Sequence, residues 1–96
     1  MFTMARSAMQ QLGDRVRSAR KRAGLSQSAF AEKCGMDRLY LGRIELGKQN
    51  PTVAILMRIA FEAGTDAATM LAGIVVDPEE VRASPRPNRR ARSQPS

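Results

Sequence analysis

The stretch that decides the fold covers residues 24–60 and has the sequence GLSQSAFAEKCGMDRLYLGRIELGKQNPTVAILMRIA. It contains two short amphipathic segments, 27–34 and 38–46, separated only by Gly35-Met36-Asp37. Two helices joined by a three- to four-residue turn with a glycine are typical of a helix-turn-helix, whose second helix fits the ~12 Å wide major groove of DNA. The spacing therefore predicts a helix-turn-helix from Gln27 to Leu46.

The residue types within this stretch fit the packing that such a unit requires. Ala31 is small where the two helices cross, and Gly35 supplies the turn conformation. Ser26 and Asp37 are suitable N-caps for the two helices. The positions that we expect to be buried are Phe30, Cys34, Met36, Leu41 and Ile44.

Three further helices are expected, one before this unit and two after it. Apolar residues recur at helical spacing in 11–23, and Gly24 ends that segment. Thr52 is a suitable cap for a helix over 53–63, and Asp66 for a short helix over 67–71. The inward residues predicted for these helices are Leu12, Val16, Ala19, Ala23, Val53, Leu56, Ile59, Ala60 and Ala63. We therefore expect an all-α domain of five helices.

The two ends of the chain differ in composition from this domain. From Asp77 onward the chain is rich in Pro, Arg, Ser and Asn, and residues 82–96 hold five arginines and no acid, so they carry +5 of the net +7. This composition predicts a flexible N-terminus over 1–9, a helical domain over 10–76 and a disordered basic tail over 77–96. The tail is either a solubilising end or a source of nonspecific attraction to nucleic acid.

Composition also argues against several classes of function. With no His, a single Cys and no Gly-rich phosphate loop, we expect no enzyme, no cofactor and no metal site. No secretory signal is evident, and the apolar runs fall short of the ~20 residues that span a bilayer. We expect a cytoplasmic protein without a membrane partner, and the pI near 11.1 suggests a polyanionic partner.

Several short pieces together resemble the Cro and phage-repressor type of helix-turn-helix, the XRE family. These pieces are Leu25-Ser26-Gln27, Ala31-Glu32-Lys33-Cys34-Gly35, Arg43-Ile44-Glu45 and the segment 47–51. The resemblance covers about 12–71, and the run Asp37-Arg38-Leu39-Tyr40-Leu41-Gly42 is most similar to controller proteins of restriction-modification systems. It implies a phage-repressor-like fold of five helices and a transcriptional regulator, such as a repressor, that binds a palindromic operator in double-stranded DNA as a homodimer.

The resemblance also implies roles for individual residues. Base contacts are expected from Arg38, Leu39 and Arg43, because arginine can bond guanine twice and leucine can contact a thymine methyl. Phosphate contacts are expected from Gln27, Tyr40, Lys48 and Asn50. Arg20 and Glu45 match a structural ion pair that links the first and third helices. Two departures from the family pattern are Gly42, in mid-helix, and the apolar Leu46.

The apolar triplet 74–76 leaves two possibilities open, since it can pack back on the domain or contact a second subunit. The candidate dimer residues are Leu71, Ile74, Val75 and Val76. Two other functions also stay open. One is an antitoxin-like module that binds an unknown protein partner with the same fold, and the other is nonspecific coating of nucleic acid.

Overall fold

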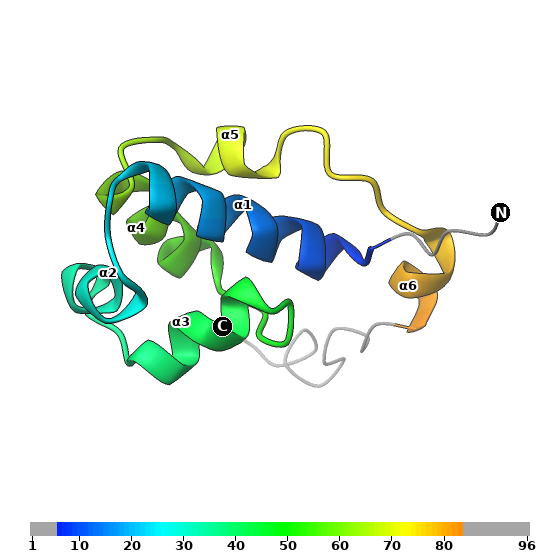
Figure 1. Ribbon diagram of the computed structural model, residues 1–96. Coiled ribbons are helices and arrows are strands. Elements are labelled where there is room, and N and C mark those ends of the chain that lie inside the picture. Colours follow the sequence, from blue (N-terminus) through cyan, green and yellow to red (C-terminus); the bar gives the residue numbers. More distant parts are fainter. Residues whose placement is uncertain (1–5, 84–96) are drawn as a thin grey trace, which may run out of the picture.

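The computed structural model of the chain describes residues 6–83, which form six α-helices and no strand (Figure 1). The helices are α1 (Ala8–Arg22), α2 (Gln27–Cys34), α3 (Arg38–Glu45), α4 (Val53–Glu62), α5 (Ala67–Leu71) and α6 (Pro78–Ala83). The first five were expected, and the all-α fold class is confirmed. Residues 1–5 and 84–96, which belong to the predicted flexible N-terminus and basic tail, lie outside the described residues.

Side-chain caps fix the start of the first five helices. Ser26, Asp37, Thr52 and Asp66 each accept a backbone N–H at the start of the helix that the sequence assigned to them. Helix α1 begins at Ala8, three residues earlier than predicted. The reason is a capping box, in which Gln10 N–H donates to Ser7 Oγ and Ser7 N–H donates to Gln10 Oε1, both at 3.0 Å.

The core lies where α1 crosses the other helices. In Figure 1, α1 runs through the middle of the molecule, with α5 along one side and α3 along the other. The large side chains with less than 2% exposure come from α1 to α4 and are Val16, Phe30, Leu41, Ile44 and Ile59. Because each of these helices contributes to one core cluster, the position of α3 depends on α1, α2 and α4 together.

Helices α1 and α3 approach so closely that no side chain fits between their backbones at one point. A Cβ added at Gly13 would lie 2.5 Å from the carbonyl oxygens of both Ile44 and Glu45. Gly13 therefore lets the two helices touch through their backbones. This contact fixes the end of α3 against α1.

Helix α6 is a correction to the prediction of a disordered tail from residue 77. Pro78 occupies the first helical position, where its missing N–H costs nothing, and Asp77 accepts the Glu79 N–H at 2.9 Å. Glu79 and Glu80 lie in the first turn, where acidic side chains are favourable. The prolines after Asp77 thus permit a short helix over 78–83, and one of them begins it.

Polar side chains of α1 attach the C-terminal segment to the domain. The Gln11 side chain donates to the Val75 carbonyl at 2.8 Å and accepts the Val75 N–H at 3.0 Å. Arg15 donates to the carbonyls of Thr69 and Met70, and Glu80 accepts the Ala8 N–H. These contacts place α6 beside the N-terminus of α1 (Figure 1).

The three residues of the apolar triplet 74–76 do not share one environment. Ile74 packs against the core cluster, whereas Val75 and Val76 are exposed. The predicted inward residues of α4 also need a correction, because Val53, which was expected to be buried, is 71% exposed.

Among residues 6–83, no helix combines the length and the apolar character needed to cross a membrane.

Candidate nucleic-acid interface

The turn between α2 and α3 has the geometry that the sequence predicted. Gly35 follows α2 in the left-handed conformation, with φ 71° and ψ 32°, which a residue with a side chain rarely adopts. The Met36 N–H then donates to the Ala31 carbonyl at 2.9 Å, and Asp37 caps α3. The chain therefore reverses within three residues, and α3 packs directly against α2.

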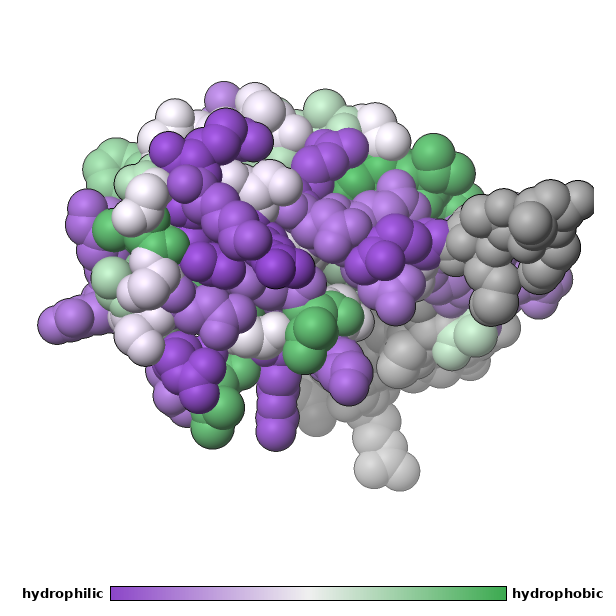
Figure 2. Space-filling model, in the orientation of Figure 1, coloured by the Kyte–Doolittle hydropathy of each residue, from purple (hydrophilic) through white to green (hydrophobic). Residues whose placement is uncertain are grey.

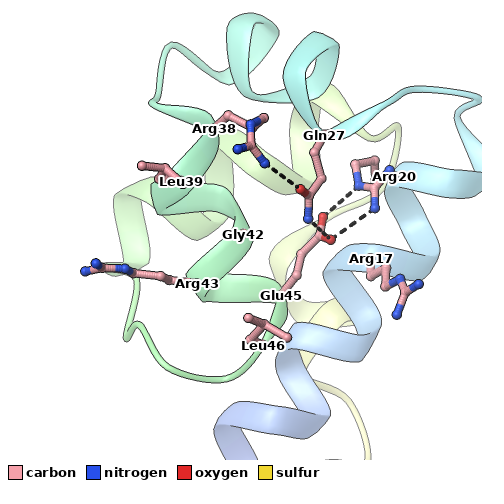
Figure 3. Close-up of a pocket in the computed structure, with 9 residues that line it drawn as sticks. All are labelled: Arg17, Arg20, Gln27, Arg38, Leu39, Gly42, Arg43, Glu45 and Leu46. Carbon is pink, nitrogen blue, oxygen red and sulfur yellow. Dashed lines mark hydrogen bonds and ion pairs between the residues drawn. The ribbon is translucent and has the colours of Figure 1, made fainter.

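A groove of about 520 Å³ lies between α1, the start of α2 and the exposed side of α3 (Figure 3). It is lined by Arg17, Arg20, Gln27, Arg38, Leu39, Gly42, Arg43, Glu45 and Leu46. The three residues predicted to contact bases, Arg38, Leu39 and Arg43, all lie on α3 at this groove and are exposed. Of the four predicted phosphate residues, the groove contains only Gln27.

An ion pair between Arg20 and Glu45 forms the floor of the groove. Arg20 Nε donates to Glu45 Oε2 at 2.7 Å, and Arg20 Nη2 donates to Glu45 Oε1 at 3.1 Å. Arg20 is 7% exposed and Glu45 is 5% exposed. The hydrogen bond to Glu45 raises the pKa of Arg20 against the opposing effect of burial, so Arg20 stays charged. This is the pair between the first and third helices that the resemblance implied.

Gln27 continues the hydrogen-bonded chain from this ion pair to the start of α3. Its Nε2 donates to Glu45 Oε1 at 3.0 Å, and its Oε1 accepts from Arg38 Nη1 at 3.3 Å. Because the Glu45 carboxylate can only accept, it fixes which end of the Gln27 amide faces it. The amide oxygen is thereby presented to Arg38 (Figure 3).

The remaining predicted phosphate residues are not among those that line the groove. Tyr40 is half-buried against the core and lines a smaller hollow with Asp37, Leu39 and Arg43. Lys48 and Asn50 are exposed in the loop after α3. Of the predicted phosphate residues, all except Gln27 thus lie outside the lining of the groove along α3.

Three residues line the groove although the sequence assigned them no contact with DNA. The sequence predicted no specific contact for Arg17, yet it lines the groove; the usable signal was its spacing of three from Arg20, which puts both on one side of α1. Leu46 is 62% exposed at the rim. Gly42 faces the amide of Gln27, and an added Cβ would stay 3.9 Å from it.

The groove is positively charged. Its only carboxylate, Glu45, is paired with Arg20, while the side chains of Arg17 and Arg43 have no partner among residues 6–83. Figure 2 shows hydrophilic residues covering the near side of α1 next to this region. Such a surface attracts a polyanion.

The comparisons with known proteins agree with this geometry. The sequence profile of the family described as Helix-turn-helix (HTH_3) matches residues 16–60. The solved structure of the master regulator for biofilm formation SinR in complex with DNA is 34% identical, with a TM-score of 0.60, over 62% of this chain and 97% of that one. The chain belongs to the helix-turn-helix family.

Two further solved structures place this helix-turn-helix protein within the family. The restriction-modification controller protein C.AhdI from Aeromonas hydrophila is 29% identical, with a TM-score of 0.62, over 65% of this chain and 94% of that one. The SinR/SinI protein complex contains a chain that is 31% identical, with a TM-score of 0.63, over 74% of this chain and 72% of that one. The predicted resemblance to controller proteins is confirmed. No relative was found among curated protein sequences.

Proposed function

We propose that this helix-turn-helix protein is a transcriptional regulator that binds a specific operator with α3 in the major groove of DNA. The observation that carries the proposal is the groove along α3, where exposed arginines stand beside an apolar side chain. Arg38 and Arg43 are suited to the paired acceptors of guanine, and Leu39, which is 60% exposed, is suited to a thymine methyl. One α-helix fits the major groove.

Gln27 serves this function mainly by positioning Arg38. One of its amide hydrogens is taken by Glu45 and its oxygen by Arg38, which leaves one side-chain N–H for the phosphate contact that the sequence predicted. A guanidinium held by a fixed acceptor loses less conformational entropy when it binds a base. The chain from Arg20 to Arg38 therefore links the packing of the core to base recognition.

Phosphate contacts fall to residues at the edges of the groove. Lys48 and Asn50 extend from the loop after α3, Tyr40 lies on α3 itself, and Arg17 extends from α1. Contacts of this kind fix the register of the protein on the duplex and supply affinity without sequence preference.

The operator is proposed to be palindromic and the protein a homodimer. A single domain of this size contacts few base pairs, and two copies related by a two-fold axis bind half-sites spaced by ~34 Å. Of the predicted dimer residues, Leu71, Val75 and Val76 are exposed and stay candidates. Ile74 packs on the core, so it has less surface to offer.

The test compares Arg43→Ala with Lys48→Ala, which each remove one exposed cation that has no side-chain partner among residues 6–83. The operator is first selected from a random duplex library at ~150 mM salt, where exposed charges are screened beyond ~8 Å. Arg43→Ala should relax preference at one base pair per half-site by about 1–3 kcal/mol. Lys48→Ala should weaken all sequences alike and reduce the salt slope by about 1.

Two outcomes would contradict the proposal. If the library yields no enriched sequence, binding is nonspecific. If the two variants lose affinity equally on every sequence, α3 does not discriminate bases.

A further inference from the structure

The exposed side of α3 has an apolar centre with an arginine on each side. Leu39, Gly42 and Leu46 follow one another at spacings of three and four, so they lie in one row along the helix, which we term the α3 row. Leu46 belongs to it because this C-cap residue keeps the right-handed helical conformation. Successive residues of an α-helix are rotated by about 100°, which places Arg38 on one side of the row and Arg43 on the other. All five residues line the groove (Figure 3).

The two leucines of the α3 row are more exposed than their surroundings explain. Leu39 is 60% exposed and Leu46 is 62% exposed. Among residues 6–83, they are the only large apolar side chains in the lining of a groove that otherwise consists mainly of charged residues. Apolar side chains gain free energy only when an apolar surface covers them. A ligand that fits this groove therefore brings apolar groups to its centre and hydrogen-bond acceptors to its sides.

Nothing inside the protein explains the glycine in the middle of the row. A Cβ added at Gly42 would meet only the Gln27 amide, at 3.9 Å, and the backbone of Gly42 is not in the left-handed conformation. Glycine is nevertheless the least favourable residue in a helix interior apart from proline. Gly13 is different, because a Cβ there would collide with the backbone of α3. At Gly42 the free space faces the groove, so it is available to a ligand.

We propose that the α3 row recognises the methyl groups of thymines in the operator. Leu39 and Leu46 contact the methyl groups, and Gly42 lets the edges of the bases approach the backbone of α3 between them. Thymine is the only base of unmodified DNA that presents a methyl group in the major groove. The inference rests on the proposed function, since α3 must lie in that groove, and it adds A·T pairs between the guanines bound by Arg38 and Arg43.

The two positions at which this chain departs from the family pattern both belong to the α3 row. The mid-helix Gly42 and the apolar Leu46 extend the single apolar contact expected of Leu39 along the helix. From Leu39 to Leu46 the row covers seven residues, or about 10 Å at 1.5 Å per residue. Base pairs follow one another at ~3.4 Å along the duplex, so the row faces about three base-pair steps. Each half-site should therefore hold at least two thymines, on either strand, within about four consecutive base pairs.

The experiment removes single methyl groups from the DNA. The operator is selected from a random duplex library, and each thymine of a half-site is then replaced by uracil, which pairs with adenine in the same way and lacks only the methyl group. At a thymine that contacts the α3 row, the parent chain should bind about four-fold more weakly after the change, which corresponds to the transfer free energy of one methyl group. A thymine outside the half-site is the control for the DNA, and its replacement should leave affinity unchanged.

Substitutions in the protein assign each methyl group to a side chain. Leu39→Ala and Leu46→Ala shorten exposed side chains, so both variants should fold, as circular dichroism will check. Each should bind thymine and uracil equally at the base pair that the missing leucine contacts, because no side chain then remains to meet the methyl group. Lys48→Ala is the matched control outside the row. It should weaken binding to both duplexes and keep their four-fold ratio.

Gly42→Ala tests the close approach of the helix backbone. The added methyl group meets no obstacle inside the protein, so the variant should be at least as stable as the parent chain in urea. It should nevertheless bind the operator at least about five-fold more weakly, because the new Cβ fills space that the bases occupy in the complex. Unchanged affinity in this variant would overturn the role of Gly42.

The same measurements separate this inference from the proposed function. An operator whose half-sites lack thymine, or one whose affinity no uracil replacement lowers, would overturn methyl recognition while specific binding by α3 stands. A thymine preference that persists in both Leu39→Ala and Leu46→Ala would overturn it as well. Failure of the parent chain to prefer any selected sequence over random DNA would overturn the proposed function instead.

Discussion

Replacing Gly13 by alanine should destabilise the protein, although the same change in an ordinary helix stabilises it. The added Cβ would lie 2.5 Å from the Ile44 and Glu45 carbonyl oxygens, and real Cβ contacts are essentially never shorter than 3.0 Å. Both oxygens are backbone atoms, so α1 and α3 must separate by at least about 0.5 Å, and a packed interior resists such a shift.

Two opposing contributions to the free energy of unfolding decide whether Gly13→Ala stabilises or destabilises the protein. Alanine is favoured over glycine inside a helix by about 1 kcal/mol. Forcing extra volume into a packed contact costs about 1–3 kcal/mol and occasionally more. The same shift also disturbs the buried pair of Arg20 and Glu45, which joins these two helices. We expect a net loss of about 1–2 kcal/mol, because the strain falls on backbone and on an ion pair at once.

Gly42→Ala is the matched control. It makes the same chemical change inside a helix, but its Cβ would meet only the Gln27 amide at 3.9 Å, an ordinary contact. We expect this variant to gain about 0.5–1 kcal/mol. For a domain of this size 1 kcal/mol corresponds to a change of about 4–8 °C in Tm.

Urea unfolding of both variants, followed by circular dichroism, measures the two changes under one set of conditions. The expected result is a lower midpoint for Gly13→Ala and a higher midpoint for Gly42→Ala, each with an unchanged slope. If Gly13→Ala is as stable as the parent chain or more so, the backbone contact between α1 and α3 does not limit the packing, and the reasoning fails.

Three further predictions concern single groups. Glu45→Gln leaves the buried Arg20 charge without its counter-ion and should cost about 3–5 kcal/mol in urea unfolding, so a loss under ~1 kcal/mol would contradict a buried pair. Burial raises the pKa of the Cys34 thiol, so iodoacetamide at neutral pH should label it only in denaturant; labelling of the folded chain at the rate of a free thiol would be inconsistent with this. The hydrogen bond from the Thr69 N–H lowers the pKa of Asp66. The ionised Asp66 carboxylate therefore stabilises the folded state at pH values above its ordinary pKa of ~3.9, and this stabilisation is lost as the pH falls through the lower pKa of the folded protein. Asp66→Asn should therefore reduce the fall of Tm with acidification, and an unchanged acid profile would argue against this cap.

The sequence by itself determined the helices and the turn. Caps such as Ser26 and Asp37, the glycine at position 35 and the apolar spacing each act within a few residues, so their effect does not depend on the rest of the fold. For the same reason Ser7 and Pro78 were readable signals, although the prediction placed the start of α1 too late and missed α6. The Arg20 and Glu45 pair was implied by a resemblance to known proteins, since no local pattern joins residues 25 positions apart.

Only the tertiary structure decided how these helices use their surfaces. The touching backbones at Gly13, the contact of Gln27 with Arg38 and the place of Arg17 in the groove all depend on the crossing of α1, α2 and α3. The outer side of α4 is a similar case. Its apolar residues surround much of the helix, so periodicity cannot tell which row is buried, and the packing against α2 and α5 selects the row that faces the core. Which row stays exposed is a property of that packing, because a side chain is buried by neighbours that are distant in sequence.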